Sequence, residues 1–308
     1  MGRLEGQRAL VTGASSGVGA ATVRLLAREG ADVALIARGR PGLEAVAARA
    51  REEGARAFTM SADVADRAAL EQAVERSVRK LGGLDVVVVA AGAGAFGRFD
   101  ELPAKDFDRC VAVTFGGAVD TIRATLPHLE RTGGRLVVIG SAVDAVALSL
   151  LSPYVAAKSA LAGFLDSLRA ELRASGSPVG VSVIRPGPID TPFWRHLTHP
   201  AGLRPPSLPP LSAYTPESVA RAAVACAIEP RRSVTVGGAT LALRLASAVA
   251  RPLTERALAL AARLGRSLAG PDPHPDALWE PSGDGSVDGG LGGRPSVVTA
   301  IRLGRSRR

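Results

Sequence analysis

Cysteine and aromatic residues are both scarce in this chain of 308 residues. The two cysteines, Cys110 and Cys226, lack the spacing of a disulfide framework or a metal site, so we expect reduced thiols, no bound metal and a cytoplasmic location. Aromatic residues make up 4% of the sequence, too few for the stacking platforms of a nucleic-acid-binding protein. No apolar run reaches the roughly 20 residues that a membrane-spanning helix needs.

Lysine is the third scarce residue type, represented only by Lys80, Lys105 and Lys158, and arginine supplies the rest of the 38 basic side chains. Set against 29 acidic residues, they leave a formal net charge of +9. This balance fits an anionic partner such as a membrane surface or an acidic ligand. It fits equally well a composition that simply favours arginine, and the charge alone does not separate the two.

Short apolar segments alternate with amphipathic segments over the first 238 residues. We expect strands at residues 8–12, 32–37, 56–62, 85–90, 135–140, 179–185 and 233–236, with helices between them. The run Val86–Val89 contains no polar residue, which is typical of a parallel strand that helices cover on both faces. The alternation predicts an α/β fold, a doubly wound and Rossmann-like parallel sheet in a single domain of residues 1–238.

The sequence changes character after residue 238. Residues 239–268 place leucines and arginines at helical spacing with a break at Pro252, and we expect an amphipathic helical extension that packs on its own domain or on a second subunit. Peripheral contact with an anionic membrane surface is the alternative for this basic segment. Residues 269–308 are rich in glycine, proline and aspartate, so we expect a loosely ordered tail.

A glycine-rich turn follows the first expected strand, with the sequence Thr12-Gly13-Ala14-Ser15-Ser16-Gly17-Val18-Gly19. Glycines let the backbone turn sharply and approach a pyrophosphate, whose charge the N-terminus of the next helix then favours. The strand–turn–helix context therefore predicts a dinucleotide site, with a purely structural turn as the alternative.

The end of the second expected strand bears on which nicotinamide cofactor fits. An acidic residue there would hydrogen-bond to the 2′-hydroxyl of NAD, but this chain has Ala37-Arg38-Gly39-Arg40. Arg38 can form charge-assisted hydrogen bonds to the 2′-phosphate of NADP, with Arg40 and the Ser15 hydroxyl in support. We expect NADP(H) as the preferred cofactor and NAD(H) as the alternative.

Tyr154 and Lys158 stand four residues apart on an expected helix, so their side chains share one face. Tyrosine titrates near 10 and is a weak acid–base catalyst at neutral pH, but a neighbouring ammonium group lowers that pKa. Ser141 follows the expected strand 135–140, at the edge where such sheets bind ligands, and its hydroxyl can stabilise charge on a substrate oxygen. These three residues are candidate catalytic groups, and a surface helix pair is the alternative for Tyr154 and Lys158 alone.

These motifs, in this order and spacing, resemble the short-chain dehydrogenase/reductase family, and the C-terminal extension resembles its long-tailed branch. The resemblance covers residues 5–237. It implies hydride transfer between a nicotinamide cofactor and a carbonyl or secondary alcohol, with Tyr154 as general acid or base, Lys158 lowering its pKa and Ser141 polarising the carbonyl. The cofactor-binding residues that it implies are Gly13, Ser15, Ser16, Gly17, Val18, Gly19, Arg38, Asp63, Val64, Ala91, Gly92, Tyr154, Lys158, Pro186, Gly187, Ile189 and Thr191.

Two positions depart from the family pattern. After the fourth expected strand the chain reads Val89-Ala90-Ala91-Gly92, where many members carry two asparagines. Thr114 stands where members usually have an asparagine that holds a water in the proton relay to the lysine, and we include it among the catalytic candidates because a hydroxyl can also hold a water. Both departures motivate an alternative function, a cofactor-binding protein with weak or lost catalysis that acts by binding or as a scaffold.

Apolar residues predict the class of substrate. We expect the pocket walls to be Ala93–Phe96, Val143–Leu151, Phe193, Trp194 and Leu197. Such walls suit a small hydrophobic carbonyl or alcohol. Phe193 and Trp194 have the alternative role of pinning their loop to the core. The resemblance further implies a homo-oligomer formed through the helices that bear Cys110 and Tyr154.

Overall fold

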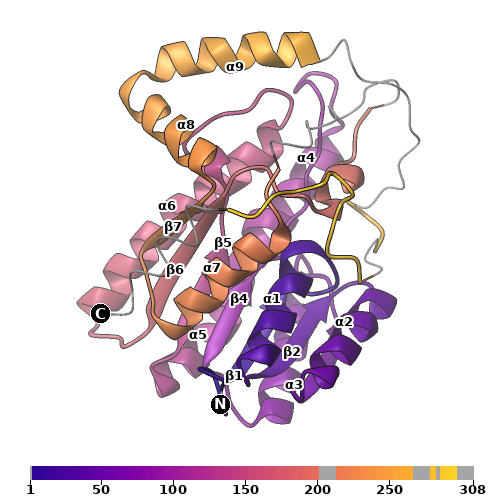
Figure 1. Ribbon diagram of the computed structural model, residues 1–308, viewed down its shortest axis with the longest axis vertical. Coiled ribbons are helices and arrows are strands. Elements are labelled where there is room, and N and C mark those ends of the chain that lie inside the picture. The colour runs from indigo at the N-terminus through magenta and orange to yellow at the C-terminus, as the bar shows by residue number, and fades with distance from the viewer. Residues whose placement is uncertain (1, 201–212, 266–277, 282–284, 297–308) are drawn as a thin grey trace.

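The computed structural model describes residues 2–200, 213–265, 278–281 and 285–296. Seven parallel strands form one sheet in the order β3-β2-β1-β4-β5-β6-β7 (Figure 1). The strands are β1 (Arg8–Thr12), β2 (Asp32–Ala37), β3 (Ala57–Ser61), β4 (Val86–Val89), β5 (Arg135–Ile139), β6 (Gly180–Pro186) and β7 (Ser233–Val236). The predicted doubly wound parallel sheet is confirmed.

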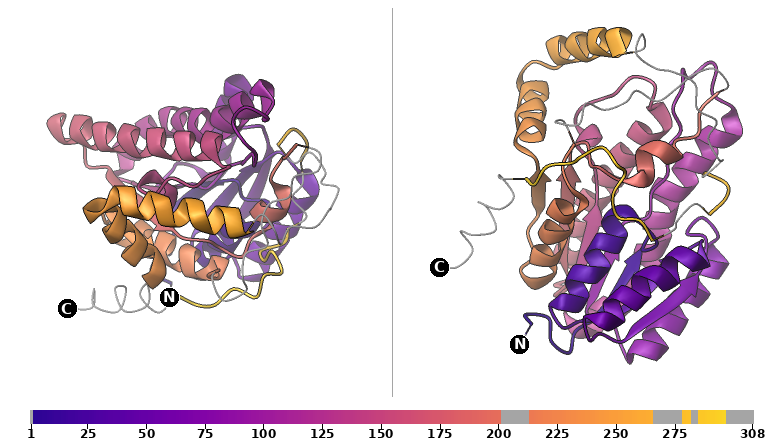
Figure 2. Two further views of the ribbon diagram at one scale, coloured as in Figure 1. Left: turned by 90° about the horizontal axis from the view of Figure 1, so that it is seen from above. Right: turned by 45° about the vertical axis from the view of Figure 1, so that its right-hand side comes forward.

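Helices cover both faces of the sheet (Figure 2). The long ones are α1 (Gly17–Arg28), α2 (Arg40–Glu52), α3 (Arg67–Leu81), α5 (Gly117–Thr132), α6 (Ser152–Ala174) and α7 (Pro216–Ile228). α1, α2 and α7 pack on one face, and α3, α5 and α6 pack on the other. In β4, Val86 and Val88 join the first core while Val87 and Val89 join the second, and all four are at most 2% exposed. A strand without polar residues is stable in this position because both of its faces are covered.

The strand order reverses at β1, which neighbours both β2 and β4. Doubly wound sheets bind ligands at this reversal, beyond the carboxyl ends of the strands. The turn after β1 approaches the loop after β4 so closely that a Cβ on Gly13 would lie 2.7 Å from backbone atoms of Ala91. Gly13 also has a φ of +67°, which favours glycine. The two loops therefore line one crevice.

The helical segment expected between the strands at residues 85–90 and 135–140 is interrupted. α4 (Ala104–Val111) leads into a π-helical turn, Ala112–Gly116, before α5 begins. At Gly117 a Cβ would lie 2.5 Å from the Val64 side chain, so α5 starts unusually close to the loop after β3. A π-helical turn allows the helix to change course at this point. Thr114 lies in this turn.

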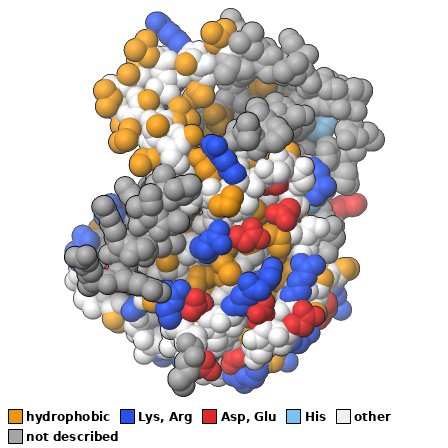
Figure 3. Space-filling model, viewed as in Figure 1, with side chains coloured by type: hydrophobic (Ala, Val, Ile, Leu, Met, Phe, Trp, Pro, Cys, Tyr) orange, Lys and Arg blue, Asp and Glu red, His pale blue; other side chains and the backbone are white. Residues whose placement is uncertain are grey.

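The C-terminal extension consists of two helices, α8 (Gly238–Val249) and α9 (Arg251–Gly265). They rise beyond the carboxyl edge of the sheet, and hydrophobic side chains gather on their surface (Figure 3). The exposed large hydrophobic residues there are Leu245, Val249, Leu253 and Leu260. The predicted helical extension is confirmed up to residue 265, and residues 266–268 lie outside the described part of the chain. No helix among the described residues combines the length and apolar character needed to cross a membrane.

Part of the stretch expected to be a loosely ordered tail lies against the body of the protein. Residues 278–281 and 285–296, the yellow segments in Figure 1, lie beyond the carboxyl edge of the sheet. The Asp190 carboxylate accepts hydrogen bonds from the N–H groups of Gly289, Leu291 and Gly293, each at 2.9 Å. The remainder of residues 269–308 lies outside the described residues.

Candidate active site

A pocket with a volume of about 720 Å³ opens at the carboxyl ends of the strands. Every residue predicted to bind the cofactor lines this pocket, from Gly13 in the first turn to Thr191 beyond β6. Ser141, Tyr154 and Lys158 line it as well. The remaining catalytic candidate, Thr114, is fully buried and is not part of the lining. Motifs that are far apart in the sequence thus meet around one cavity.

The glycine-rich turn presents backbone groups to this pocket. Ser16 precedes α1 in an extended conformation, and no side chain caps the first N–H groups of the helix. The first turn of α1 also contains no acidic residue, so the helix itself places no negative charge at the positive end of its dipole. The N–H of Gly17 donates to the carbonyl oxygen of Ser286 at 2.9 Å. An N-terminus of this kind suits a phosphate group.

Arg38, directly after β2, is half-buried among polar groups. Its Nη1 donates to the carbonyl oxygens of Leu278 and Trp279, both at 3.0 Å. Burial lowers the pKa of Arg38, and the negative charge of Asp63 offsets only part of that effect. Asp63 forms an ion pair with Arg109. Burial acts to raise the pKa of Asp63, but its hydrogen bonds, including the one from Arg109, hold that pKa below the usual value.

Two residues of α4 contact the C-terminal segment next to Arg38, and sequence motifs did not indicate either of them. Arg109 donates to the Leu278 carbonyl oxygen at 3.2 Å, and its guanidinium carbon lies 5.4 Å from the centre of the Trp279 ring. Asp106 accepts a hydrogen bond from the Trp279 indole N–H at 2.9 Å. Arg40, which we expected to assist Arg38, is exposed at the start of α2 and is not part of the pocket lining.

Tyr154 and Lys158 lie one turn apart on α6, next to Ser141 at the end of β5. The Lys158 Nζ is 5.7 Å from the centre of the Tyr154 ring and donates to the Ile139 carbonyl oxygen at 2.8 Å. The Ser141 hydroxyl acts on Tyr154 to lower its pKa. The Ser141 hydroxyl also accepts a hydrogen bond from the N–H of Val143 at 3.3 Å. The structure therefore brings these three catalytic candidates together.

Burial dominates the protonation of this group. It raises the pKa of Tyr154 above its usual value, and the hydrogen bond with Ser141 offsets only part of that rise. Burial also lowers the pKa of Lys158 to about 8. The pKa of Tyr154 is thus raised and that of Lys158 lowered, because desolvation penalises both charged forms, and the effect of Lys158 on Tyr154 stays a prediction. The result is a neutral phenol beside an amine that titrates near neutral pH.

Thr114 is bound to the loop after β4. Its hydroxyl donates to the Ala93 carbonyl oxygen at 2.9 Å and accepts from the Ala93 N–H at 3.0 Å. Cys110, one turn earlier, donates to the same carbonyl oxygen at 3.2 Å. A Cβ on Gly92 would lie 3.9 Å from both the Thr114 Oγ1 and the Lys158 Nζ, so these two polar atoms face the same small space.

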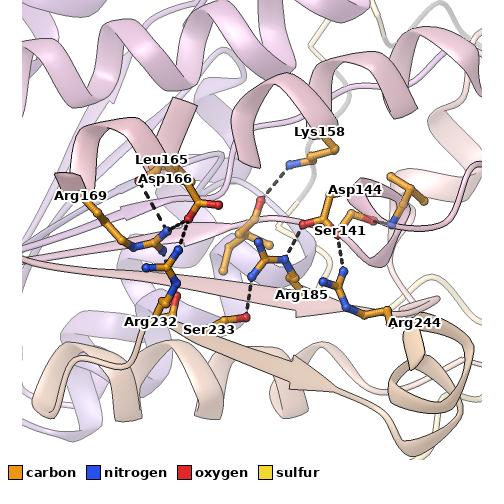
Figure 4. A network of polar contacts seen from close by, with 12 residues as sticks. Ser141, Asp144, Lys158, Leu165, Asp166, Arg169, Arg185, Arg232, Ser233 and Arg244 are labelled. Atoms are coloured by element: carbon orange, nitrogen blue, oxygen red, sulfur yellow. Dashed lines mark hydrogen bonds and ion pairs between the residues drawn. The ribbon is translucent and has the colours of Figure 1, made fainter. Parts of the chain in front are cut away.

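A buried carboxylate, Asp144, ties the turn after Ser141 to two distant segments (Figure 4). Its side chain is 4% exposed and forms ion pairs with Arg185 of β6 and Arg244 of α8. The charge of Asp144 also acts to raise the pKa of Lys158, against the larger effect of burial. Asp144 therefore joins the catalytic edge of the sheet to the C-terminal extension.

A second contact reinforces this connection. The Ser247 hydroxyl of α8 donates to the Ala145 carbonyl oxygen at 2.8 Å. Arg244 is one of the arginines of the extension to which sequence reasoning assigned no partner. Its contact with Asp144 joins residues 100 positions apart, and no motif indicates it.

The expected apolar wall is largely present. The predicted wall residues that line the pocket include Ala93, Phe96, Val143, Val146, Leu148, Leu151, Phe193 and Trp194. Leu197, by contrast, is buried in a small core behind the wall. Leu243 of α8 and Leu258 of α9 add to the lining, which sequence reasoning did not indicate.

The two aromatic residues of the loop after β6 occupy different positions. The Phe193 ring lies 5.2 Å from the Tyr154 ring, centre to centre, and so faces the catalytic group. The Trp194 indole N–H donates to the Ile189 carbonyl oxygen at 2.8 Å and so holds the loop to the segment after β6. Both of the roles considered from the sequence therefore occur here.

Comparisons with known proteins agree with this geometry. Residues 7–201 match a family model described as short chain dehydrogenase. The uncharacterised oxidoreductase YxnA of Bacillus subtilis is 32% identical over 256 residues, covering 82% of this chain and 72% of that protein. The probable oxidoreductase EphD of Mycobacterium tuberculosis is 42% identical over 183 residues, covering 59% of this chain but only 31% of that longer protein.

Two solved structures resemble about three quarters of the chain. An alcohol dehydrogenase from the archaeon Thermococcus sibiricus, complexed with 5-hydroxy-NADP, superposes with a TM-score of 0.66 at 30% identity, covering 75% of this chain and 95% of that one. A short chain dehydrogenase from Mycobacterium paratuberculosis, bound to NAD, has a TM-score of 0.66 at 25% identity, covering 76% of this chain and 97% of that one.

Proposed function

Since the chain belongs to the short-chain dehydrogenase family and is a dehydrogenase or reductase, we propose that it transfers hydride between NADP(H) and a small hydrophobic carbonyl or secondary alcohol. One observation carries the proposal. Ser141, Tyr154 and Lys158 share a single apolar-walled pocket with the glycine-rich turn and Arg38. A pocket with these parts can hold a dinucleotide and an apolar substrate side by side.

The residues present fit NADP at its phosphate-bearing end. The N-terminus of α1 suits the pyrophosphate, and the Arg38 guanidinium suits a 2′-phosphate. Solved relatives bind NADP or NAD, so the preference for NADP rests on this chain's own residues. The position after β2 holds Arg38 rather than the carboxylate that would bind a 2′-hydroxyl and repel a phosphate.

When bound, the nicotinamide cofactor supplies or accepts the hydride, and the chain supplies orientation and the proton. In reduction, Tyr154 donates its phenolic proton to the substrate oxygen. Ser141 donates a hydrogen bond to the same oxygen as negative charge develops. The raised pKa of Tyr154 keeps that proton in place at neutral pH. In oxidation, Tyr154 takes the proton back, and the ammonium form of Lys158 favours the phenolate.

Thr114 supports the proton path in this proposal. Its hydroxyl uses its donor and one acceptor position on Ala93, which leaves one acceptor position for a water facing Lys158. The same engagement with Ala93 favours a second candidate function, a cofactor-binding protein with weak catalysis. The two candidates differ in turnover and agree in cofactor binding.

We also propose that the protein is cytoplasmic and forms a homo-oligomer through the α4–α5 region and α6. Both cysteines are free and buried, which suits a reducing compartment. Light scattering coupled to size-exclusion chromatography tests the assembly, and a monomer across the working concentration range would contradict it.

NADPH oxidation tests the main proposal and separates it from the second candidate. The assay pairs NADPH or NADH with a panel of hydrophobic ketones and aldehydes, alongside a direct measurement of cofactor binding by fluorescence. We expect turnover with at least one apolar carbonyl and a preference for NADPH. Tight NADPH binding without turnover across the panel would favour the cofactor-binding alternative.

A further inference from the structure

The described C-terminal residues 278–281 and 285–296 are called here the C-terminal strap. Part of the strap contacts groups that the proposed function assigns to the nucleotide. Arg38 contacts the carbonyl oxygens of Leu278 and Trp279. In the glycine-rich turn, the Ser15 carbonyl oxygen accepts from the Gly285 N–H at 3.1 Å. The Gly17 N–H donates to Ser286 at the same point.

The far end of the strap is anchored away from these groups. Asp190 accepts three backbone N–H groups of residues 289–293. The N–H of Ser296 donates to the Ser218 hydroxyl at 2.9 Å, and the Ser296 hydroxyl accepts from the Gly237 N–H at 3.1 Å. Residues 289–296 are therefore held by contacts that are separate from those of residues 278–279.

The contacts at Arg38 are of a kind that an anion can replace. A guanidinium group bonds more strongly to a phosphate than to neutral peptide carbonyls, because both partners are then charged. The half-buried position of Arg38 strengthens this difference, and the two nearest charges, Arg109 and Asp63, form an ion pair with each other. Leu278 and Trp279 thus satisfy Arg38 with weak acceptors at the position where a 2′-phosphate would bind.

We propose that the C-terminal strap competes with the 2′-phosphate of NADP for Arg38, so that NADP displaces residues 278–279 when it binds. The inference rests on the proposed function, because it needs the pocket to bind a nicotinamide dinucleotide. NAD carries only a hydroxyl at this position and leaves the Arg38 contacts with the strap in place. The Arg38 contacts of residues 278–279 therefore lower the affinity for 2′-phosphorylated nucleotides alone, whereas residues 285–286, at the Gly17 N–H, lie where the pyrophosphate of NADP and of NAD would bind.

Trp279 offers a way to loosen the strap at a side chain. Its indole N–H is bonded to Asp106, its ring packs near the Arg109 guanidinium, and it is 41% exposed, so its removal leaves the cores of the sheet intact. The matched control is Phe99→Ala, because Phe99 is a 74% exposed aromatic residue whose ring packs on Phe107 of α4 rather than on Arg109.

Isothermal titration calorimetry with 2′,5′-ADP and with 5′-AMP measures the competition in the full chain and needs no substrate. If the strap occupies Arg38 in about nine-tenths of the molecules, Trp279→Ala binds 2′,5′-ADP roughly tenfold more tightly. The affinity for 5′-AMP stays within about twofold, and Phe99→Ala matches the wild type with both ligands. Weaker binding of 2′,5′-ADP by Trp279→Ala would mean that the strap forms part of the nucleotide site, and an unchanged affinity would mean that it does not compete; either result overturns the inference.

Hydrogen–deuterium exchange of the wild-type chain provides a second readout. Adding NADP is expected to increase exchange at residues 278–281, while adding NAD leaves it unchanged. Protection of these residues by NADP would overturn the inference and leave the proposed function intact. If neither nucleotide binds at all, the proposed function itself is wrong and the inference falls with it.

Discussion

The catalytic half and the nucleotide half of the pocket are both completed by residues from the C-terminal part of the chain, but by contacts of different kinds. In the catalytic half, Arg244 of α8 pairs with the buried Asp144 carboxylate behind Ser141. In the nucleotide half, peptide carbonyls of the C-terminal strap rest on Arg38. Breaking a buried ion pair is costly, whereas a peptide carbonyl is readily replaced by an anion. We therefore expect the Arg244–Asp144 ion pair, called here the brace, to be a fixed contact of the catalytic half. The strap carbonyls on Arg38 are, by contrast, a contact that a ligand can displace.

Removal of the Tyr154 hydroxyl is expected to have the largest effect, and it falls on the catalytic half alone. Tyr154→Phe removes the proton donor, so turnover falls by about 10²–10⁴-fold. The Kd for NADPH stays within about twofold, because in our proposal the Tyr154 hydroxyl acts on the substrate oxygen. Steady-state kinetics and fluorescence titration measure the two effects. Undiminished turnover would remove Tyr154 from the mechanism.

Arg38→Met is the corresponding change in the nucleotide half. A hydrogen bond to a charged group contributes about 1.5–3 kcal/mol, so NADP binding weakens by roughly 10–150-fold. NAD binding changes by less than about threefold, because NAD has no phosphate at this position. Calorimetric titration with both cofactors measures the split. Equal losses for NADP and NAD would show that Arg38 does not recognise the 2′-phosphate.

Arg244→Gln tests the brace. Removing one partner of a buried ion pair costs about 3–5 kcal/mol, and because Arg185 remains paired with Asp144 we expect a smaller loss of about 1–3 kcal/mol in the free energy of unfolding. The matched control is Arg251→Gln, since Arg251 pairs with Glu255 on the exposed surface of α9, and such pairs contribute about 0.5 kcal/mol or less. Urea unfolding compares the two. Equal losses in both variants would mean that the Arg244–Asp144 ion pair contributes no more to stability than an exposed pair.

The smallest expected effect concerns the pH dependence of the free energy of unfolding, and Lys158→Met tests it. Burial lowers the pKa of Lys158 from 10.5 to about 8, so between these values the unfolded chain binds more protons than the folded chain. The wild type therefore gains stability as pH rises through this window, by at most about 1.4 kcal/mol per pH unit, while the methionine variant lacks this gain. Urea unfolding of both chains at pH 7, 8 and 9 measures the difference between them. A difference that stays constant up to pH 9 would contradict a lowered Lys158 pKa.

Much of the fold and of the pocket could be predicted from local patterns. The apolar run of β4, the glycine-rich turn and the four-residue spacing of Tyr154 and Lys158 each depend on neighbours in the sequence, and each is found where it was expected. The protonation of Tyr154 and Lys158 could not be predicted in the same way. Their pKa values depend on how deeply the fold buries them, and spacing does not report burial.

Long-range contacts account for the rest of what the sequence did not indicate. Asp144 meets Arg244 across 100 positions, and Arg38 meets Trp279 across 241. The strap lies in a stretch that is rich in glycine and proline. Such a composition indicates poor order because it offers few apolar side chains to bury. Several attachments of the strap use backbone groups, such as the three N–H groups that donate to Asp190, and backbone groups leave no mark in the pattern of side chains.

Transfer of deuterium from NADPH labelled at the nicotinamide C4 tests the central proposal most directly. The wild-type enzyme is incubated with each C4 epimer of the labelled cofactor and a hydrophobic ketone, and the product is analysed by mass spectrometry. We expect an alcohol that carries one deuterium on its carbinol carbon from one epimer and none from the other. Bound NADPH that delivers no deuterium from either epimer to any carbonyl of the panel would contradict it.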